Sequence, residues 1–317
     1  MRIVVTGGVG FIGSNLADAL VARGDDVLVI DDLSTGTLAN LNAEARFEQL
    51  DVRTEAAAAA VRRFRPQAVM HLAAQMSVGR SVREPLYDAE VNVLGALRML
   101  EAAREAGARF VFASTGGALY GDAETLPTPE VCPAWPVSPY GVAKLSVEHY
   151  LHCYRFTHGL SYVALRYANV YGPRQNPHGE AGVVAIFCRA LLASVQPVIT
   201  GDGRQTRDYV FVGDVVRANL LAVDARASGH YNVGTGVQTD VNALFQLIAE
   251  RVGGNVTARH GDPRPGEQRT SALDSRLILK ELGWRPEVTL AEGISQTVDW
   301  FCRLTASEAS LAAAKAI

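Results

Sequence analysis

Two residues in the stretch SPYGVAK have the types and spacing of a proton-transfer pair. Tyr140 and Lys144 are four residues apart, so a helix through this segment brings them onto one face. A nearby ammonium favours the charged form of a phenol, and we expect Lys144 to lower the pKa of Tyr140 from about 10. With 10 tyrosines and three lysines in 317 residues, about 0.1 such spacings are expected by chance. The pair predicts a tyrosine that moves protons; the alternative is a packed tyrosine beside a solvated lysine.

A glycine-rich turn near the start of the chain predicts a cofactor site. TGGVGFIG lies between an expected strand and an expected helix and carries Gly7, Gly10 and Gly13. Glycine there permits a tight turn, the approach of backbone to a pyrophosphate, and close packing of the helix, whose N-terminal amides favour anions. About twenty residues later, Asp31 ends the strand, where a carboxylate binds ribose hydroxyls and repels a 2′-phosphate. The pattern predicts NAD rather than NADP; the alternative is a glycine turn that binds nothing. The positive nicotinamide of NAD would act on the pKa of Tyr140 in the same direction as Lys144.

Short β-branched runs alternate with helical patterns through the first half of the chain. The runs are RIVV, DVLVI, RFEQL, AVMHL, RFVFA and SYVALR. This alternation is typical of an α/β protein with a doubly wound parallel sheet, here a Rossmann domain over 1–170 with returns near 212–235. After a loop rich in Gly, Pro and Asn, we expect 171–211 and 236–303 to form a smaller, interleaved α/β lobe that binds the substrate. Residues 304–317 are expected to form a frayed helix or a tail.

Composition excludes several classes of protein. The chain is 48% apolar with a formal net charge of -3 and no basic run, which argues against disorder and against a nucleic-acid partner. Its cysteines form no C-x-x-C pair, so we expect reduced thiols in the cytoplasm, with neither a disulfide frame nor a metal site. The longest apolar segment, VVAIFCRALLASV, is short and contains Arg189, so no signal peptide and no membrane span are expected.

These motifs together resemble those of a known family, the extended short-chain dehydrogenase/reductases that act on nucleotide sugars. Within it the chain is most similar to NAD-dependent UDP-glucose 4-epimerases. The resemblance is carried by TGGVGFIG, HLAAQ at 71–75, the hydroxyls at 114–115, YGVAK, LRYANVYGPR and GDGRQTRDYVFVGD, and it extends from residue 1 to about 303. It implies NAD as cofactor, a UDP-sugar as substrate, and a homodimer formed through helices near 84–106 and 138–157.

The resemblance also implies which residues bind. Those expected to bind NAD are Gly7, Gly10, Phe11, Ile12 and Gly13 at the pyrophosphate, Asp31, Asp32, Ser34, Thr35 and Gly36 at the ribose, Asp51 and Val52 at the adenine, and Leu72, Ala73, Ala74, Asn92, Tyr140, Lys144 and Tyr167 along the rest of the cofactor. Those expected to hold the sugar nucleotide are Thr115, Asn169, Arg207, Arg264 and Ser271. Arginines suit bidentate contacts to a diphosphate; the alternative for each arginine is a surface salt bridge.

The residues after the fifth expected strand indicate the reaction. Relatives that dehydrate the sugar carry Thr-Asp-Glu there and decarboxylases keep the glutamate, whereas residues 116–118 are Gly, Gly and Ala. A site that oxidises C4 but lacks these carboxylates is left with 4-epimerisation through a transient 4-keto sugar. Tyr140 would then be base and acid, Lys144 would orient the ribose and tune Tyr140, and Thr115 rather than Ser114 is chosen as the bridging hydroxyl. The glycines would leave space for the sugar to turn; the alternative is a turn that needs positive φ.

Ser271 bears on the choice of substrate. It falls at the family position that crowds the sugar C2 substituent, where enzymes restricted to plain hexoses often carry tyrosine. The small side chain predicts turnover of UDP-GlcNAc and UDP-GalNAc in addition to UDP-Glc and UDP-Gal.

Other functions of the same fold are a 4,6-dehydratase, a decarboxylase, a 4-ketoreductase and an NAD-binding sensor without turnover. The missing carboxylates disfavour the first two, and Asp31 disfavours a ketoreductase that uses NADPH. A sensor would need neither Tyr140 nor Lys144.

Overall fold

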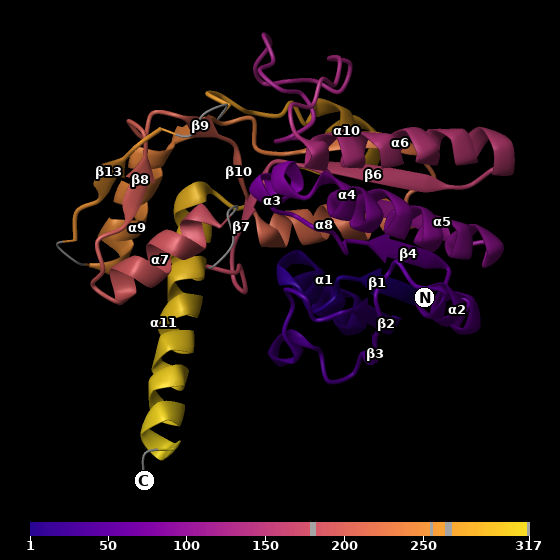
Figure 1. Ribbon diagram of the computed structural model, residues 1–317, viewed down its shortest axis with the longest axis horizontal. Helices are drawn as coiled ribbons and strands as arrows, with labels where there is room; N and C mark the ends of the chain where they lie inside the picture. Colours follow the sequence, from indigo (N-terminus) through magenta and orange to yellow (C-terminus); the bar gives the residue numbers. More distant parts are fainter. Residues whose placement is uncertain (178–181, 254–255, 264–267, 316–317) are drawn as a thin grey trace.

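A seven-stranded parallel sheet forms the centre of the computed structural model, which describes residues 1–177, 182–253, 256–263 and 268–315 (Figure 1). The strands, in spatial order, are β11 (Gly229–Val233), β6 (Tyr162–Tyr167), β5 (Arg109–Thr115), β4 (Ala68–His71), β1 (Arg2–Thr6), β2 (Asp26–Asp31) and β3 (Arg46–Gln49). The order reverses between β1 and β4, and doubly wound sheets bind ligands at the carboxyl ends of the strands beside such a reversal. The predicted α/β Rossmann fold is confirmed.

Both faces of the sheet are apolar, as a buried parallel sheet requires. In β1, Ile3 and Val5 pack into one core cluster, whereas Val4 between them packs into the other. One face is covered by α1 (Phe11–Ala22), α8 (Val212–Asp224) and α10 (Arg276–Leu282), and the other by α2 (Glu55–Phe64), α5 (Ala96–Glu105) and α6 (Pro139–His158). This packing fixes the carboxyl ends of the central strands in one row.

A second lobe lies on the side of the sheet away from the N-terminus (Figure 1). Its helices are α7 (Val183–Leu192), α9 (Val241–Val252) and α11 (Leu290–Lys315). Its short strands pair as β7 (Asn169–Tyr171) with β10 (Tyr209–Phe211), β8 (Val198–Thr200) with β13 (Arg259–Gly261), and β9 (Thr206–Arg207) with β12 (Thr239–Asp240). The three helices share an apolar core that includes Phe187, Leu244 and Phe301.

Two elements depart from the expected division of the chain. Helix α10 falls within 236–303, yet Ile278 and Trp284 pack in the core of the large sheet, and α10 contacts β11. We therefore propose the same two domains with α10 moved to the Rossmann domain. Helix α11 continues past the expected boundary at 303 to Lys315, so the helical alternative for this end of the chain holds over the described residues, where ASEASLAAAK is rich in alanine, the strongest helix former. No helix within the described ranges combines the length and apolar character needed to cross a membrane.

The segment expected as one helix near 84–106 is interrupted. It consists of α4 (Pro85–Ala89), a π-helical turn η2 (Glu90–Gly95) and α5, and it is preceded by the short helix α3 (Val78–Arg83). A further short turn, η1 (Leu38–Asn40), lies between β2 and β3. Turns of the π type are frequent at functional sites, and η2 buries Asn92, one of the residues expected to line the cofactor.

Candidate active site

The glycine loop has no room for side chains at two of its three positions. Gly7 has φ +70°, and a Cβ there would lie 2.7 Å from the backbone nitrogen of Ala73. A Cβ at Gly13 would overlap the carbonyl oxygen of Gly7, so α1 packs directly on the turn. No side chain caps α1 at Gly10, which leaves the amides of the first turn, beginning at Phe11, able to receive an anion. This cradle fits the pyrophosphate of a dinucleotide.

Asp31 ends β2 beside this loop. Its carboxylate accepts hydrogen bonds from the backbone nitrogens of Val9 at 3.2 Å and Leu33 at 2.9 Å, and burial raises its pKa. The backbone nitrogen of Thr37 donates to Val9, and a Cβ at Gly36 would touch Val9. The loop after β2, which contains Asp32, Ser34, Thr35 and Gly36, therefore packs against the glycine loop, where a ribose would lie.

The two residues expected at the adenine follow β3. The Asp51 carboxylate accepts hydrogen bonds from the Arg53 guanidinium, which lowers its pKa. Val52 is buried, and its side chain contacts η2 at Gly95. The aspartate side chain is thus engaged by Arg53, and a role beside the adenine stays a prediction.

A clamp of hydrogen bonds holds the segment that follows β4. The backbone nitrogens of Leu72 and Ala73 donate to Thr6 on the neighbouring strand β1. Asn92 accepts from the backbone nitrogen of Gln75 at 3.0 Å and donates to its carbonyl oxygen at 2.9 Å. Asn92 therefore positions the stretch containing Leu72, Ala73 and Ala74 next to the glycine loop.

Tyr140 and Lys144 lie together at the end of β5. Ser138 caps α6 by accepting from the nitrogen of Gly141 at 3.2 Å, which places Tyr140 in the first turn. Lys144 is 2% exposed, and its Nζ donates to the carbonyl oxygen of Ala113 at 2.9 Å. The same Nζ lies 4.7 Å from the centre of the Phe112 ring and 5.8 Å from the centre of the Tyr140 ring. The expected pairing on one helix face is present.

The electrostatics of the pair differ from the sequence expectation. Burial lowers the pKa of Lys144 to about 8, while Asp88 and Glu148 act in the opposite direction. Burial also raises the pKa of Tyr140, and the carboxylate of Asp88 adds to this effect. The expectation that Lys144 lowers the phenol pKa is therefore wrong for the chain alone, because loss of solvent outweighs an ammonium directed at Ala113. The other expected contribution, the positive charge of the nicotinamide, comes from the cofactor and would lower this pKa.

The structure separates the two candidate hydroxyls. Ser114 is buried, and its Oγ donates to Oε1 of Glu148 at 2.5 Å. Glu148 in turn pairs with the buried Arg166 at 2.6 Å, and Arg166 donates to the hydroxyl of Tyr120 at 2.7 Å. Thr115 is half-buried and its hydroxyl makes no hydrogen bond within the described ranges. The choice of Thr115 over Ser114 stays a prediction, supported by this commitment of Ser114.

The absence of a side chain has a different consequence at Gly116 than at Gly117. A Cβ at Gly116 would overlap the side chain of Leu273, whereas a Cβ at Gly117 would meet only Oδ1 of Asn169, at 3.6 Å. Neither glycine has positive φ, so the alternative of a strained turn is wrong. Gly116 lets Leu273 pack on the strand end, and Gly117 leaves open space beside a residue expected to bind the sugar nucleotide.

The remaining expected residues are distributed between the sheet and the lobe. Asn169 begins β7, Arg207 ends β9, and Ser271 is buried two residues before Leu273. Arg264 lies outside the described residues.

The phenol of Tyr167 is engaged beneath the sheet. Tyr167 is buried, and its hydroxyl accepts a hydrogen bond at 2.8 Å from the side-chain amide of Asn219 on α8. Its backbone carbonyl oxygen accepts a hydrogen bond at 2.7 Å from the nitrogen of Gly116, and the expected contact of Tyr167 with the cofactor stays a prediction.

Sequence reasoning missed the buried polar residues behind the site. Asp88 accepts hydrogen bonds from Gln75 and Asn92, and Glu148 holds Ser114 and Arg166. One signal was available, because Asp88 lies four residues before Asn92 and Glu148 lies four residues after Lys144. The helix spacing that linked Tyr140 to Lys144 extends to both carboxylates.

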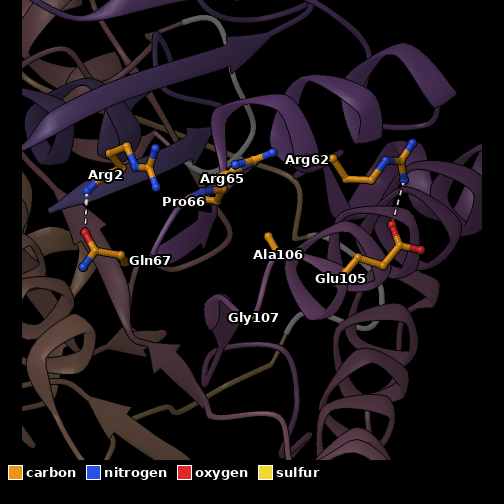
Figure 2. Close-up of a pocket in the computed structure, with 8 residues that line it drawn as sticks. All are labelled: Arg2, Arg62, Arg65, Pro66, Gln67, Glu105, Ala106 and Gly107. Carbon is orange, nitrogen blue, oxygen red and sulfur yellow. Dashed lines mark hydrogen bonds and ion pairs between the residues drawn. The ribbon is translucent and has the colours of Figure 1, made fainter.

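A hollow of about 530 Å³ lies at the opposite edge of the sheet (Figure 2). It is lined by Arg2, Arg62, Arg65, Pro66, Gln67, Glu105, Ala106 and Gly107. They lie at the start of β1 and at or just after the ends of α2 and α5, and none belongs to the predicted site. Within the described ranges, no three His, Cys, Asp or Glu residues are grouped so that they could hold a metal ion.

Comparison with known proteins places the chain in a family. Residues 3–234 match the NAD dependent epimerase/dehydratase family, and the chain belongs to this family. It is 47% identical to the UDP-glucose 4-epimerase of Mycolicibacterium smegmatis, over 95% of this chain and 98% of that protein.

Two solved structures are similar over nearly the whole chain. The UDP-glucose 4-epimerase of Thermotoga maritima, solved with UDP-glucose, has a TM-score of 0.93 at 47% identity and covers 96% of this chain and 100% of its own. The UDP-N-acetylglucosamine 4-epimerase of Methanobrevibacter ruminantium M1, solved with UDP-N-acetylmuramic acid, has a TM-score of 0.90 at 34% identity, over 96% and 98%.

The buried ion pair behind β5 generates a stability prediction. Glu148→Gln leaves the guanidinium of Arg166 buried without its counter-charge, and we expect a loss of about 3 kcal/mol in the free energy of unfolding, measured by urea denaturation. Glu55→Gln is the control, because Glu55 pairs with Arg62 at the surface and is expected to contribute less than about 1 kcal/mol. Equal effects of the two substitutions would contradict the assignment.

Proposed function

We propose that the protein is an NAD-dependent UDP-hexose 4-epimerase that interconverts UDP-glucose and UDP-galactose. The observation that carries the proposal is the pair formed by the half-buried Tyr140 and the buried Lys144 at the end of β5, next to glycine rather than carboxylate residues at 116 and 117. The family match and the similarity to UDP-glucose 4-epimerases support the same activity.

The chain's residues fit the cofactor. The uncapped first turn of α1 suits the pyrophosphate, and Asp31 and the loop to Gly36 suit the ribose. NAD, when bound, supplies the acceptor for the hydrogen on C4 of the sugar and a positive charge beside the phenol. That charge is the second cation that Tyr140 needs, since burial raises its pKa.

Tyr140 moves the proton in the proposed reaction. Its phenolate oxygen takes the proton of the C4 hydroxyl when C4 is oxidised and returns it after the 4-keto sugar has turned over. Thr115 bridges the phenol and the sugar, and Lys144 supplies the nearby positive charge and orients the ribose. Because C4 is first oxidised and then reduced, the cycle needs no external oxidant or reductant.

Residues 116–118 of the site lack the carboxylates that would catalyse elimination of water from the sugar. A dehydratase of this fold needs an acid and a base at C5 and C6, and residues 116–118 offer none. Gly117 leaves space beside Asn169, and we propose that this space lets the ketone change the face it presents.

The direct test is turnover by the purified protein. It is incubated with UDP-galactose without added NAD, and the products are followed by NMR. Formation of UDP-glucose with no net redox change is expected. A stable 4-keto product would instead identify a dehydratase and overturn the proposal.

Replacing the phenol isolates the role of Tyr140. Tyr140→Phe is expected to slow interconversion by about 10²–10⁴-fold, since it removes the proton-transferring hydroxyl, while bound NAD measured after denaturation stays at the wild-type level. Tyr150→Phe, on the exposed side of the same helix, is the control and should leave turnover unchanged. Normal turnover by Tyr140→Phe would remove the assignment.

We further propose that the enzyme also accepts N-acetylated hexoses. The support is Ser271, a small buried residue two positions before the Leu273 that packs on Gly116, and the similarity to a UDP-N-acetylglucosamine 4-epimerase. UDP-GlcNAc should therefore be epimerised, and Ser271→Tyr should reduce kcat/KM for UDP-GlcNAc at least about tenfold while UDP-galactose is affected less. Absence of UDP-GlcNAc turnover by the wild type would exclude this specificity but not the 4-epimerase activity.

We also propose a cytoplasmic homodimer. Leu86 on α4 is 81% exposed and Phe156 on the adjacent α6 is 75% exposed, and Leu94 on η2 and Val142 on α6 are exposed as well. Apolar surface of this kind is typical of a subunit contact, and the four cysteines are free thiols, as in a reducing compartment. Light scattering is expected to give twice the mass of one chain; the mass of a monomer would contradict the dimer.

A further inference from the structure

A buried carboxylate near the active site has no cationic partner within hydrogen-bond distance in the described part of the chain. Asp88, on α4, is 1% exposed. Its Oδ1 accepts hydrogen bonds from the side-chain amides of Gln75 and Asn92, both at 2.8 Å. Its Oδ2 is also buried and has no hydrogen-bond partner among the described residues. A carboxylate is rarely buried in this way without a cation, because desolvation of a charge is costly.

The charges around Asp88 show which cation it serves. Helices α4 and η2 pack against α6, and Asp88 interacts electrostatically with both Lys144 and Tyr140. The other carboxylate near Lys144, Glu148, is neutralised by Arg166, whose guanidinium donates to both of its oxygens.

A third group near Lys144 carries no charge. His71 on β4 is buried between aromatic rings, and burial together with Lys144 lowers its pKa to about 3. Asp88 is thus the one negative charge near Lys144, within the described ranges, that no cation already balances.

We propose that Asp88 is a positioning residue of the active site: one carboxylate oxygen fixes Asn92 and Gln75, and the charge of the group stabilises the ammonium of Lys144. The hydrogen bonds of Asp88 and its charge act at different places in the site. The first shapes the segment after β4 that faces the cofactor, and the second keeps a cation beside the catalytic phenol. The inference rests on the proposed function and assigns a residue to that same site.

The charge of Asp88 changes the pKa of Lys144 in a defined direction. Burial lowers the pKa of Lys144 to about 8, and the Asp88 carboxylate opposes this shift. Removing the negative charge therefore lowers the pKa of Lys144 further, and the ammonium is lost at a lower pH. The same change lowers the pKa of Tyr140, which Asp88 raises. Asp88 thus sets the alkaline pH at which the cation of the pair disappears.

Two substitutions separate the parts. Asp88→Asn keeps an oxygen that can accept from Gln75 and Asn92 but removes the charge. Asp88→Ala removes both the charge and the acceptor. Glu90→Gln is the matched control, because Glu90 lies on the adjoining turn, is exposed, and pairs with Arg53 at 3.5 Å.

The protein's lysine content allows a direct measurement. Lys144, Lys280 and Lys315 are the only lysines in the sequence, so ¹³C-lysine labelling gives three side-chain signals, which Lys280→Arg and Lys315→Arg assign. In the NAD-bound protein, we expect the Lys144 signal to titrate about one pH unit lower in Asp88→Asn than in the wild type. Glu90→Gln should leave the titration in place. In Asp88→Asn, the pH at which kcat/KM for UDP-galactose falls on the alkaline side should decrease together with the pKa of Lys144.

The role of Asp88 as a hydrogen-bond acceptor is tested by measuring how much NAD stays bound. Asp88→Ala is expected to lose bound NAD on gel filtration, while Asp88→Asn retains it. An unchanged Lys144 titration in NAD-bound Asp88→Asn would overturn the electrostatic part, and full NAD retention by Asp88→Ala would overturn the positioning part. Since the NMR titration needs no turnover, it can fail while the epimerase activity holds, and it can succeed if that activity is absent.

Discussion

The site depends on one buried cation. The ammonium of Lys144 is almost completely removed from water and donates to the carbonyl oxygen of Ala113. This bond ties α6 to the end of β5 and so holds Tyr140 at the carboxyl edge of the sheet. Burying a charge is costly, and the surroundings offset the cost with a backbone carbonyl, the ring of Phe112, and the carboxylate of Asp88.

The same edge of the sheet brings the cofactor elements to this cation. The order of the strands reverses between β1 and β4, so the glycine loop after β1 meets the segment after β4. A backbone contact at Gly7 is so close that a Cβ would reach Ala73, and Asn92 clamps the far end of that segment through Gln75. The proton-transfer pair and the pyrophosphate cradle therefore share one rigid frame.

Sequence patterns predicted the frame and the reactive pair, because both follow from local spacing. The glycines from Gly7 to Gly13 lie close together in the sequence, as do Tyr140 and Lys144. Asp31 stands at the end of an expected strand. The raised pKa of Tyr140 was not predictable in this way, since it arises from burial in the folded chain and from Asp88 on another helix. The need for glycine at position 116 could not be predicted either, because Leu273, which packs on it, is more than 150 residues away in the sequence.

The most direct test follows the hydrogen on C4 itself. UDP-galactose deuterated at C4 is converted in ordinary water, and the deuterium in the product is located by NMR. The account predicts UDP-glucose that keeps the deuterium at C4, since the hydrogen leaves and returns within one closed site while Tyr140 handles only the hydroxyl proton. Loss of the label to solvent, or its absence from C4 of the product, would contradict the account.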